Sequence, residues 1–180
     1  MVIETDRLLL RPLERSDAGE LVAMHADPEV GRFFVRGVDQ ARARQLIEID
    51  RQEWRDRGHG LLAVIDRASG AWLGRVALKY WENFDEVEVG WALRREVWGR
   101  GYATEAAYAC ASWGFRDFDM PYLTAMIRPG NLRSVAVARR LSMTPLRADL
   151  FSEVAVVVYA ITRARWAERL AATNGSLYTR

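Results

Sequence analysis

This chain of 180 residues contains one cysteine, Cys110, two histidines and a single lysine, Lys79. One thiol excludes an internal disulfide framework and a zinc site built from cysteine ligands. His25 and His59 are too far apart in the sequence to indicate a metal site or a catalytic triad. We therefore expect no bound metal, and the alanines around Cys110 indicate a structural thiol packed inside a helix.

Long apolar runs and an excess of charge of one sign are also missing. No run approaches the ~20 apolar residues that span a bilayer, and the N-terminus lacks the basic and apolar regions of a signal peptide. A cytoplasmic protein with no membrane partner is expected. The 26 basic and 24 acidic residues are interspersed, so the charge pattern gives no reason to expect binding to nucleic acid.

The chain does have enough apolar sequence for one full core, since 50% of its residues are hydrophobic and no linker or repeat divides it. A single domain over residues 1–180 is expected. Alternating and short apolar runs predict strands at residues 8–13, 61–65, 72–80, 86–93, 122–127 and 154–162. Helical spacing and capping residues predict helices that end at Asp27-Pro28, run from Asp39 to Gly58, and cover 101–115 and 131–141.

The order of these elements indicates an α+β fold. The strands at 61–65, 72–80 and 86–93 follow one another through short connections and predict an antiparallel meander. The strand at 122–127 is separated from 86–93 by a helix, and such a connection favours parallel pairing. Helices layered on one mixed sheet are the expected architecture.

The most informative segment runs from Trp98 to Glu105 and leads from a strand into a helix. Gly99 and Gly101 have no Cβ, so the backbone can turn sharply and direct several N–H groups at one point. Those amides belong to the first turn of the helix, where the helix dipole favours an anionic ligand. A nucleotide P-loop would need Lys-Ser or Lys-Thr after the second glycine, and a dinucleotide fingerprint would need a third glycine where Glu105 stands. A strand-to-helix turn that binds nothing is the alternative interpretation.

The order Trp98-Gly99-Arg100-Gly101-Tyr102-Ala103 resembles the pyrophosphate-binding signature of the GNAT acetyltransferases, Arg/Gln-x-x-Gly-x-Gly/Ala. Trp98 departs from that pattern, but with Thr104-Glu105 the segment is similar to the branch that includes the ribosomal-protein N-terminal acetyltransferases. Three further segments resemble the same branch: Thr5 to Pro12 with Ser16-Asp17, Val87 to Trp91, and Asn131-Leu132-Arg133-Ser134. The resemblance covers about residues 3–166 and leaves 167–180 as a C-terminal tail.

The resemblance implies a GNAT fold, in which a mixed, mostly antiparallel central sheet contains a splayed parallel pair of strands and carries helices on both faces. It also implies acetyl-CoA as cosubstrate, with the pantetheine arm in the gap between the splayed strands. The implied cofactor-binding residues are Trp91, Ala92 and Leu93 for the pantetheine, Trp98, Gly99, Arg100, Gly101, Tyr102, Ala103 and Thr104 for the pyrophosphate, Asn131 for a pantetheine amide, and Ser134 beside the sulfur.

Transfer of an acetyl group to an amine requires a base that removes a proton from the ammonium, and an acid can protonate the departing thiolate. Glu88 is the expected base: it lies among alternating apolar residues, where desolvation would raise its pKa, and it resembles a glutamate that family members use on this strand. Its alternative role is to face solvent or pair with an arginine. Asp85 and Glu86 are nearby substitutes that could act through water.

The general acid has two candidates. The resemblance gives this role to Ser134, and Tyr159 is a second candidate, although its apolar strand favours a position in the core. On spacing alone, Asn131 is equally well interpreted as an N-cap and Ser134 as a residue of the first helical turn.

The sequence thus predicts an N-acetyltransferase that moves the acetyl group to a primary amine, on a protein N-terminus or a small molecule, by direct attack in a ternary complex. Phe33, Phe34, Trp81 and Phe84 fall in expected loops that would rim the acceptor side, and His25 is a further candidate there. A non-catalytic acyl-CoA sensor with the same glycine loop is the alternative function. Dimers are common among relatives, so a homodimer is compatible with the resemblance.

Overall fold

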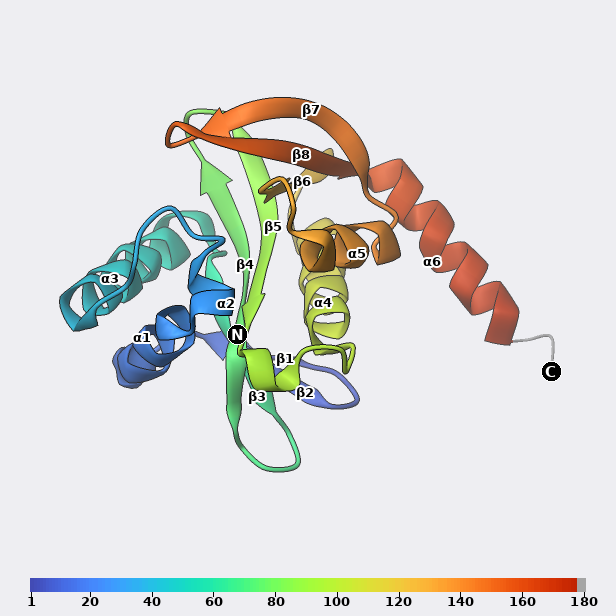
Figure 1. The fold of residues 1–180 in the computed structure, drawn as a ribbon. Coiled ribbons are helices and arrows are strands. Elements are labelled where there is room, and N and C mark those ends of the chain that lie inside the picture. The colour runs from blue at the N-terminus through green and yellow to red at the C-terminus, as the bar shows by residue number, and fades with distance from the viewer. Residues whose placement is uncertain (178–180) are drawn as a thin grey trace.

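A computed structural model describes residues 1–177, with side chains as far as residue 172. One eight-stranded sheet runs through the molecule in the order β1-β2-β3-β4-β5-β6-β8-β7 (Figure 1). Its strands are β1 (Ile3–Glu4), β2 (Leu8–Pro12), β3 (Leu61–Asp66), β4 (Trp72–Trp81), β5 (Glu86–Leu93), β6 (Tyr122–Ile127), β7 (Thr144–Phe151) and β8 (Val154–Thr162).

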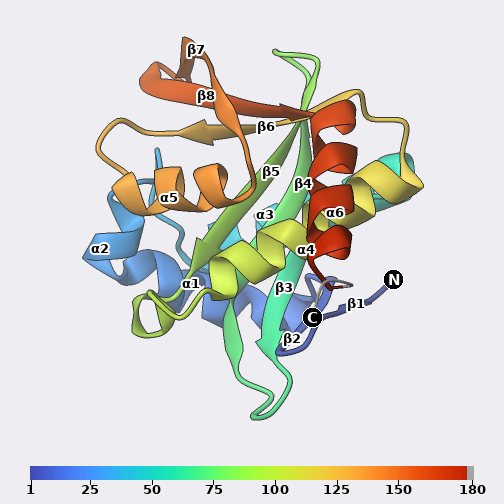
Figure 2. The same cartoon turned by 90° about the vertical axis from the view of Figure 1, so that its right-hand side faces the viewer.

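Helices cover both faces of this sheet. The views in Figures 1 and 2 place α1 and α3 on one face and α4 and α5 on the other. The helices are α1 (Ala18–Ala26), α2 (Pro28–Gly31), α3 (Gln40–Arg57), α4 (Tyr102–Asp117), α5 (Leu132–Arg140) and α6 (Arg163–Leu177), with short 3-10 turns at Arg15–Asp17 and Arg95–Val97. Within the described residues, none of the helices is long and apolar enough to cross a membrane.

The caps of α3 explain why the sequence predicts this helix well. The Asp39 side chain accepts a hydrogen bond from the Arg42 N–H at 2.8 Å, which satisfies one of the free donors of the first turn. Gly58 ends the helix with a left-handed φ of 75°, a conformation that costs glycine little. Both signals are local, and the predicted helix from Asp39 to Gly58 is confirmed.

Two hydrophobic clusters hold the layers together. The larger cluster lies between the sheet and α4 and includes Cys110, which is fully buried, and Tyr159, which is 7% exposed. The smaller cluster packs α1 and α3 against the opposite face of β3 and β4. Burial of Cys110 confirms the structural thiol, and burial of Tyr159 confirms that it is a core residue.

The pairing of β5 changes sharply from one edge to the other. Eight residue pairs align β5 with β4 in antiparallel orientation, whereas a single pair, Glu88 with Thr124, aligns β5 with β6 in parallel orientation. The two strands therefore separate beyond Glu88, and the splayed parallel pair that the resemblance implies is confirmed. Backbone groups along this gap are free to hydrogen-bond something other than a neighbouring strand.

Helix α6 runs through most of the segment expected as a C-terminal tail, and three further elements are absent from the sequence prediction: β1, α2 and β7. The last is an edge strand whose residues pair only with β8, and it contains Pro145 together with Arg147 and Asp149. Before it, α5 ends in a Schellman motif, because the Met143 N–H donates to the Ala138 carbonyl and the Ser142 N–H to the Arg139 carbonyl. Ser142 has a φ of 63° there, a conformation that usually belongs to glycine.

Candidate active site

The glycine-paired loop forms an open turn at the N-terminus of α4. Gly99 and Gly101 have φ values of 77° and 81°, so the backbone uses the left-handed region at both positions, which side chains disfavour. No side chain caps the helix, and the Gly101 carbonyl accepts the Glu105 N–H at 3.0 Å. The preceding first-turn amides are therefore available for an anion.

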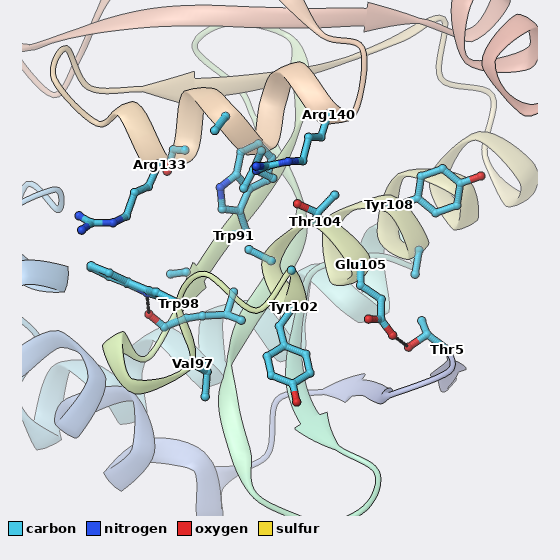
Figure 3. Close-up of a pocket in the computed structure, with 18 of the residues that line it drawn as sticks. Thr5, Trp91, Val97, Trp98, Tyr102, Thr104, Glu105, Tyr108, Arg133 and Arg140 are labelled. Atoms are coloured by element: carbon cyan, nitrogen blue, oxygen red, sulfur yellow. Dashed lines mark hydrogen bonds between the residues drawn. The ribbon is translucent and has the colours of Figure 1, made fainter. Parts of the chain in front are cut away.

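A cavity of about 1090 Å³ lies in front of this helix end, bounded by α4, α5 and the C-terminal part of β5 (Figure 3). Every predicted cofactor-binding residue except Arg100 lines it. These residues are Trp91, Ala92, Leu93, Trp98, Gly99, Gly101, Tyr102, Ala103, Thr104, Asn131 and Ser134. Arg100 is not among the described lining residues, and its carbonyl oxygen accepts a hydrogen bond from Arg7 at 2.9 Å.

Trp98 occupies the position at which the general signature has Arg or Gln. Its indole Nε1 donates to the Leu93 carbonyl at 2.9 Å, which fixes the ring against the end of β5. The guanidinium of Arg133 lies over this ring, 4.7 Å from its centroid, in a cation–π arrangement. An arginine from α5 therefore lies at the tryptophan that departs from the signature.

Arg133 and Arg140 are cavity residues that the sequence analysis did not single out. Both lie on α5 and line the cavity, and Figure 3 shows both side chains leaving α5 on the cavity side. Neither forms an ion pair with a described residue, although ion pairs do hold other arginines such as Arg11, Arg116 and Arg147. Their spacing of seven residues places them on one helix face, and that spacing was the signal available in the sequence.

Asn131 and Ser134 lie together at the start of α5. The Asn131 Oδ1 accepts a hydrogen bond from the Ser134 N–H at 3.2 Å, so Asn131 is the N-cap of this helix. Both residues also line the cavity. Capping occupies the Asn131 oxygen and leaves its NH₂ group and the Ser134 hydroxyl for a ligand.

Glu88 lies at the point where β5 and β6 begin to separate. One carboxylate oxygen accepts the Trp81 Nε1–H at 2.7 Å, and the other accepts the Met126 N–H at 3.0 Å. Burial raises the pKa of this carboxyl, while the bonds from Met126 and Trp81 and the charge of Arg75 act in the opposite direction. Glu88 is not among the described residues that line the cavity. The first β5 residue that does line it is Trp91, three positions further along the strand.

His25 lies on the same side of the sheet as Glu88 but behind Phe34. The two rings are 4.2 Å apart, and His25 is only 9% exposed. Burial lowers its pKa to about 4, with the charge of Arg75 acting in the same direction. The imidazole is therefore neutral at pH 7, and it packs against Phe34, which lines the cavity, but is not itself among the described lining residues.

The substitutes for Glu88 are held in other interactions. Glu86 is 6% exposed and accepts two hydrogen bonds from Arg147, at 2.7 and 3.0 Å, while Asp85 accepts the Tyr80 hydroxyl at 2.8 Å.

Trp81 is not a loop residue as expected, because it ends β4 and packs against Phe151. Among the described residues, no group of three His, Cys, Asp or Glu side chains is arranged to hold a metal ion.

Comparison with known proteins places this geometry in a family. Residues 7–144 match the acetyltransferase (GNAT) domain. The uncharacterized protein YkkB of Bacillus subtilis (strain 168) is 32% identical over 142 residues, which cover 77% of this chain and 83% of that protein.

Solved structures agree with this match. The acetyltransferase from Agrobacterium tumefaciens superposes with a TM-score of 0.80 at 30% identity, over 89% of this chain and 94% of that one. The ribosomal L7/L12 acetyltransferase RimL, solved with coenzyme A, superposes with a TM-score of 0.76 at 18% identity, over 90% of this chain and 98% of that one. RimL shares the overall fold. The chain belongs to the GNAT acetyltransferase family.

Proposed function

We propose that this protein is an acetyl-CoA-dependent N-acetyltransferase that acts on a primary amine. The observation that carries the proposal is the path that the cavity offers from the open amides of α4 to Trp91 on β5, three positions beyond Glu88, where β5 and β6 begin to separate. Anionic phosphates suit the first end of this path. A partly desolvated carboxylate suits the second end, since proton removal needs a base with a pKa near the working pH.

In the proposed reaction, Glu88 accepts a proton from the ammonium of the acceptor, directly or through a water molecule. The neutral amine nitrogen then bonds to the thioester carbonyl carbon, and the carbon–sulfur bond breaks. A backbone N–H between Val89 and Trp91 donates to the carbonyl oxygen as negative charge develops on it. The Ser134 hydroxyl is the proposed proton donor to the departing sulfur, because it lines the cavity and its oxygen takes no part in the α5 cap. The acylated nitrogen then loses its second proton, which restores the Ser134 hydroxyl, and the proton on Glu88 passes to solvent.

One observation favours the alternative of a non-catalytic acyl-CoA sensor. Both Glu88 oxygens already accept hydrogen bonds from protein N–H groups, which is also what a purely structural carboxylate does. A base would still have lone pairs free, since a carboxylate has about four acceptor positions. Turnover therefore separates the two functions better than geometry does.

The test is release of coenzyme A from acetyl-CoA in the presence of a panel of N-terminal peptides and small amines. Amine-dependent release, with an acetylated product seen by mass spectrometry, supports the enzyme and identifies the acceptor class. Tight binding of acetyl-CoA by calorimetry with no turnover across the panel would favour the sensor. Absence of binding would contradict both functions.

A further inference from the structure

The N-terminal segment Thr5–Arg7 is fastened to α4, about 100 positions further along the chain. The Thr5 hydroxyl donates to Glu105 Oε1 at 2.6 Å, and the Arg7 N–H donates to the same oxygen at 3.1 Å. The Arg7 guanidinium pairs with the other oxygen, through Nε at 2.7 Å and Nη2 at 2.6 Å. Glu105 stands in the first turn of α4, so one carboxylate joins this segment to the helix end that faces the cavity.

Arg7 also contacts the glycine loop itself. Its Nη1 donates to the Arg100 carbonyl at 2.9 Å, and its guanidinium lies 4.4 Å from the centre of the Tyr102 ring. Between these two residues is Gly101, where an added Cβ would lie 3.4 Å from Arg7 Nη2. One side chain therefore contacts Arg100 and Tyr102 and lies beside Gly101 between them.

The conformation of this glycine loop depends on contacts from residues outside the loop. Two of its residues are glycines in the left-handed region, and glycine loses more conformational freedom on ordering than any other residue. No side chain caps the helix that follows. A binding loop held in its bound shape before the ligand arrives binds more tightly, because the ordering cost is not taken from the binding free energy.

We infer that Arg7, clamped by Glu105 and Thr5, is a positioning residue that holds the α4 amides in the arrangement that takes the diphosphate of acetyl-CoA. Arg7 is not among the described residues that line the cavity, so it acts through the loop and does not touch the ligand. The inference rests on the proposed function for the identity of the ligand. It gives the Thr5–Arg7 segment a role in cofactor affinity as well as in the fold.

The test compares Arg7→Ala with wild type on two acyl donors. With acetyl-CoA, the KM should rise about ten-fold, while kcat changes little because the reacting atoms are untouched. With S-acetylpantetheine, which has no phosphates, kcat/KM should stay within two-fold. Arg7→Lys keeps the charge pair with Glu105 but not the fork that reaches the loop carbonyl, so it should restore affinity only in part.

Arg67→Ala is the matched control. Arg67 is 44% exposed against 45% for Arg7, and it pairs with Glu4 at 3.2 Å and bonds the Thr5 carbonyl. It therefore anchors the same segment without touching the loop, and its loss should leave the KM for acetyl-CoA unchanged. Equal losses on both donors, or equal effects of Arg7→Ala and Arg67→Ala, would overturn the inference. A wild-type protein that fails to bind coenzyme A would instead contradict the proposed function.

Discussion

The two faces of the sheet around β5 differ in whether their polar groups are paired within the protein. On the α4–α5 face, the cavity presents uncapped helix amides together with the guanidinium groups of Arg133 and Arg140, neither of which is paired with a described carboxylate. On the α1–α3 face, charges are already paired inside the protein, as Glu86 is with Arg147 and Lys79 with Glu53. The first face is arranged for an anion from outside, whereas the second is arranged around its own ion pairs and the buried carboxyl groups of Glu88 and Asp50.

The largest expected effect comes from the face of paired charges. Glu88→Gln should lower kcat by about 100-fold or more, because the amide cannot accept the ammonium proton. The affinity for acetyl-CoA should be unchanged, since Glu88 lies outside the cavity. Steady-state kinetics at several pH values, with Glu82→Gln as the control, measure this effect. Glu82 is a glutamate of the turn before β5, with an 86% exposed side chain and a long ion pair with Arg57 at 3.9 Å.

A kcat that falls less than three-fold in Glu88→Gln would make Glu88 a structural residue. The melting temperatures of both variants show whether a lower kcat comes from loss of folding. A loss of folding in Glu88→Gln would show there as a drop that Glu82→Gln lacks.

A second effect should appear in stability, at Asp50 on the buried face of α3. Asp50 is 1% exposed, and its Oδ1 accepts the Leu61 N–H at 2.7 Å. Burial raises its pKa to about 7; the charge of Glu53 adds to the rise, and the Leu61 hydrogen bond, Lys79 and Arg75 oppose it. The folded state therefore keeps a proton that the unfolded state loses near pH 4. Asp50 should destabilise the fold as pH rises from 4 to 7.

Asp50→Asn removes this dependence while keeping an oxygen for the Leu61 N–H. The stability of wild type relative to Asp50→Asn should fall by about 2 kcal/mol between pH 5 and pH 7. The difference between two urea-unfolding series isolates Asp50 from His25 and His59, which titrate in both proteins. Asp56→Asn, on the exposed side of α3, is the control. A difference that is constant with pH would show that Asp50 is ionised throughout.

A smaller effect tests the face of open donors. Arg140→Ala should weaken coenzyme A binding about ten-fold if its guanidinium meets a phosphate, in line with the ~1.5–3 kcal/mol typical of hydrogen bonds to charged groups. Its neighbour Arg139 does not line the cavity, so Arg139→Ala is a matched control of the same charge. Titration calorimetry with coenzyme A and with dephospho-coenzyme A measures both. Equal affinities of Arg140→Ala and Arg139→Ala for coenzyme A would show that Arg140 does not contact a phosphate.

The same contrast explains what the sequence could and could not predict. Signals that lie within a few residues were sufficient for α3, for the loop at Gly99 and Gly101, and for the N-cap at Asn131. Glu88 was predicted as a desolvated carboxylate, but its partner Met126 is 38 positions away, and no spacing rule reaches that far. Arg147 reaches Glu86 across 61 positions, so its role in joining β7 to β5 was equally hidden.

Strand β7 was missed for a local reason. It is joined to β8 by the two-residue turn Ser152-Glu153, since Phe151 pairs with Val154. Both turn residues have positive φ values, 48° and 65°, as a type I′ turn requires. Asn-Gly is the usual sequence for such a turn, and without it the hairpin gives no signal.

The smallest predicted effect follows from this turn. Replacing Ser152-Glu153 with Asn-Gly should raise the stability by about 1 kcal/mol, because both residues then suit the left-handed region. Chemical denaturation measures the change, and activity should not alter, since neither residue lies near the cavity. A loss of stability would mean that interactions of Ser152 or Glu153 outweigh the backbone strain.

The most direct test of the contrast between the two faces is a crystal structure with coenzyme A bound. The diphosphate should lie on the amides of residues 101–104, with Arg140 beside it, and the thiol in the gap between β5 and β6 on the approach to Glu88. A diphosphate bound elsewhere, or a thiol that points away from this gap, would contradict the assignment of the cavity and of Glu88 together.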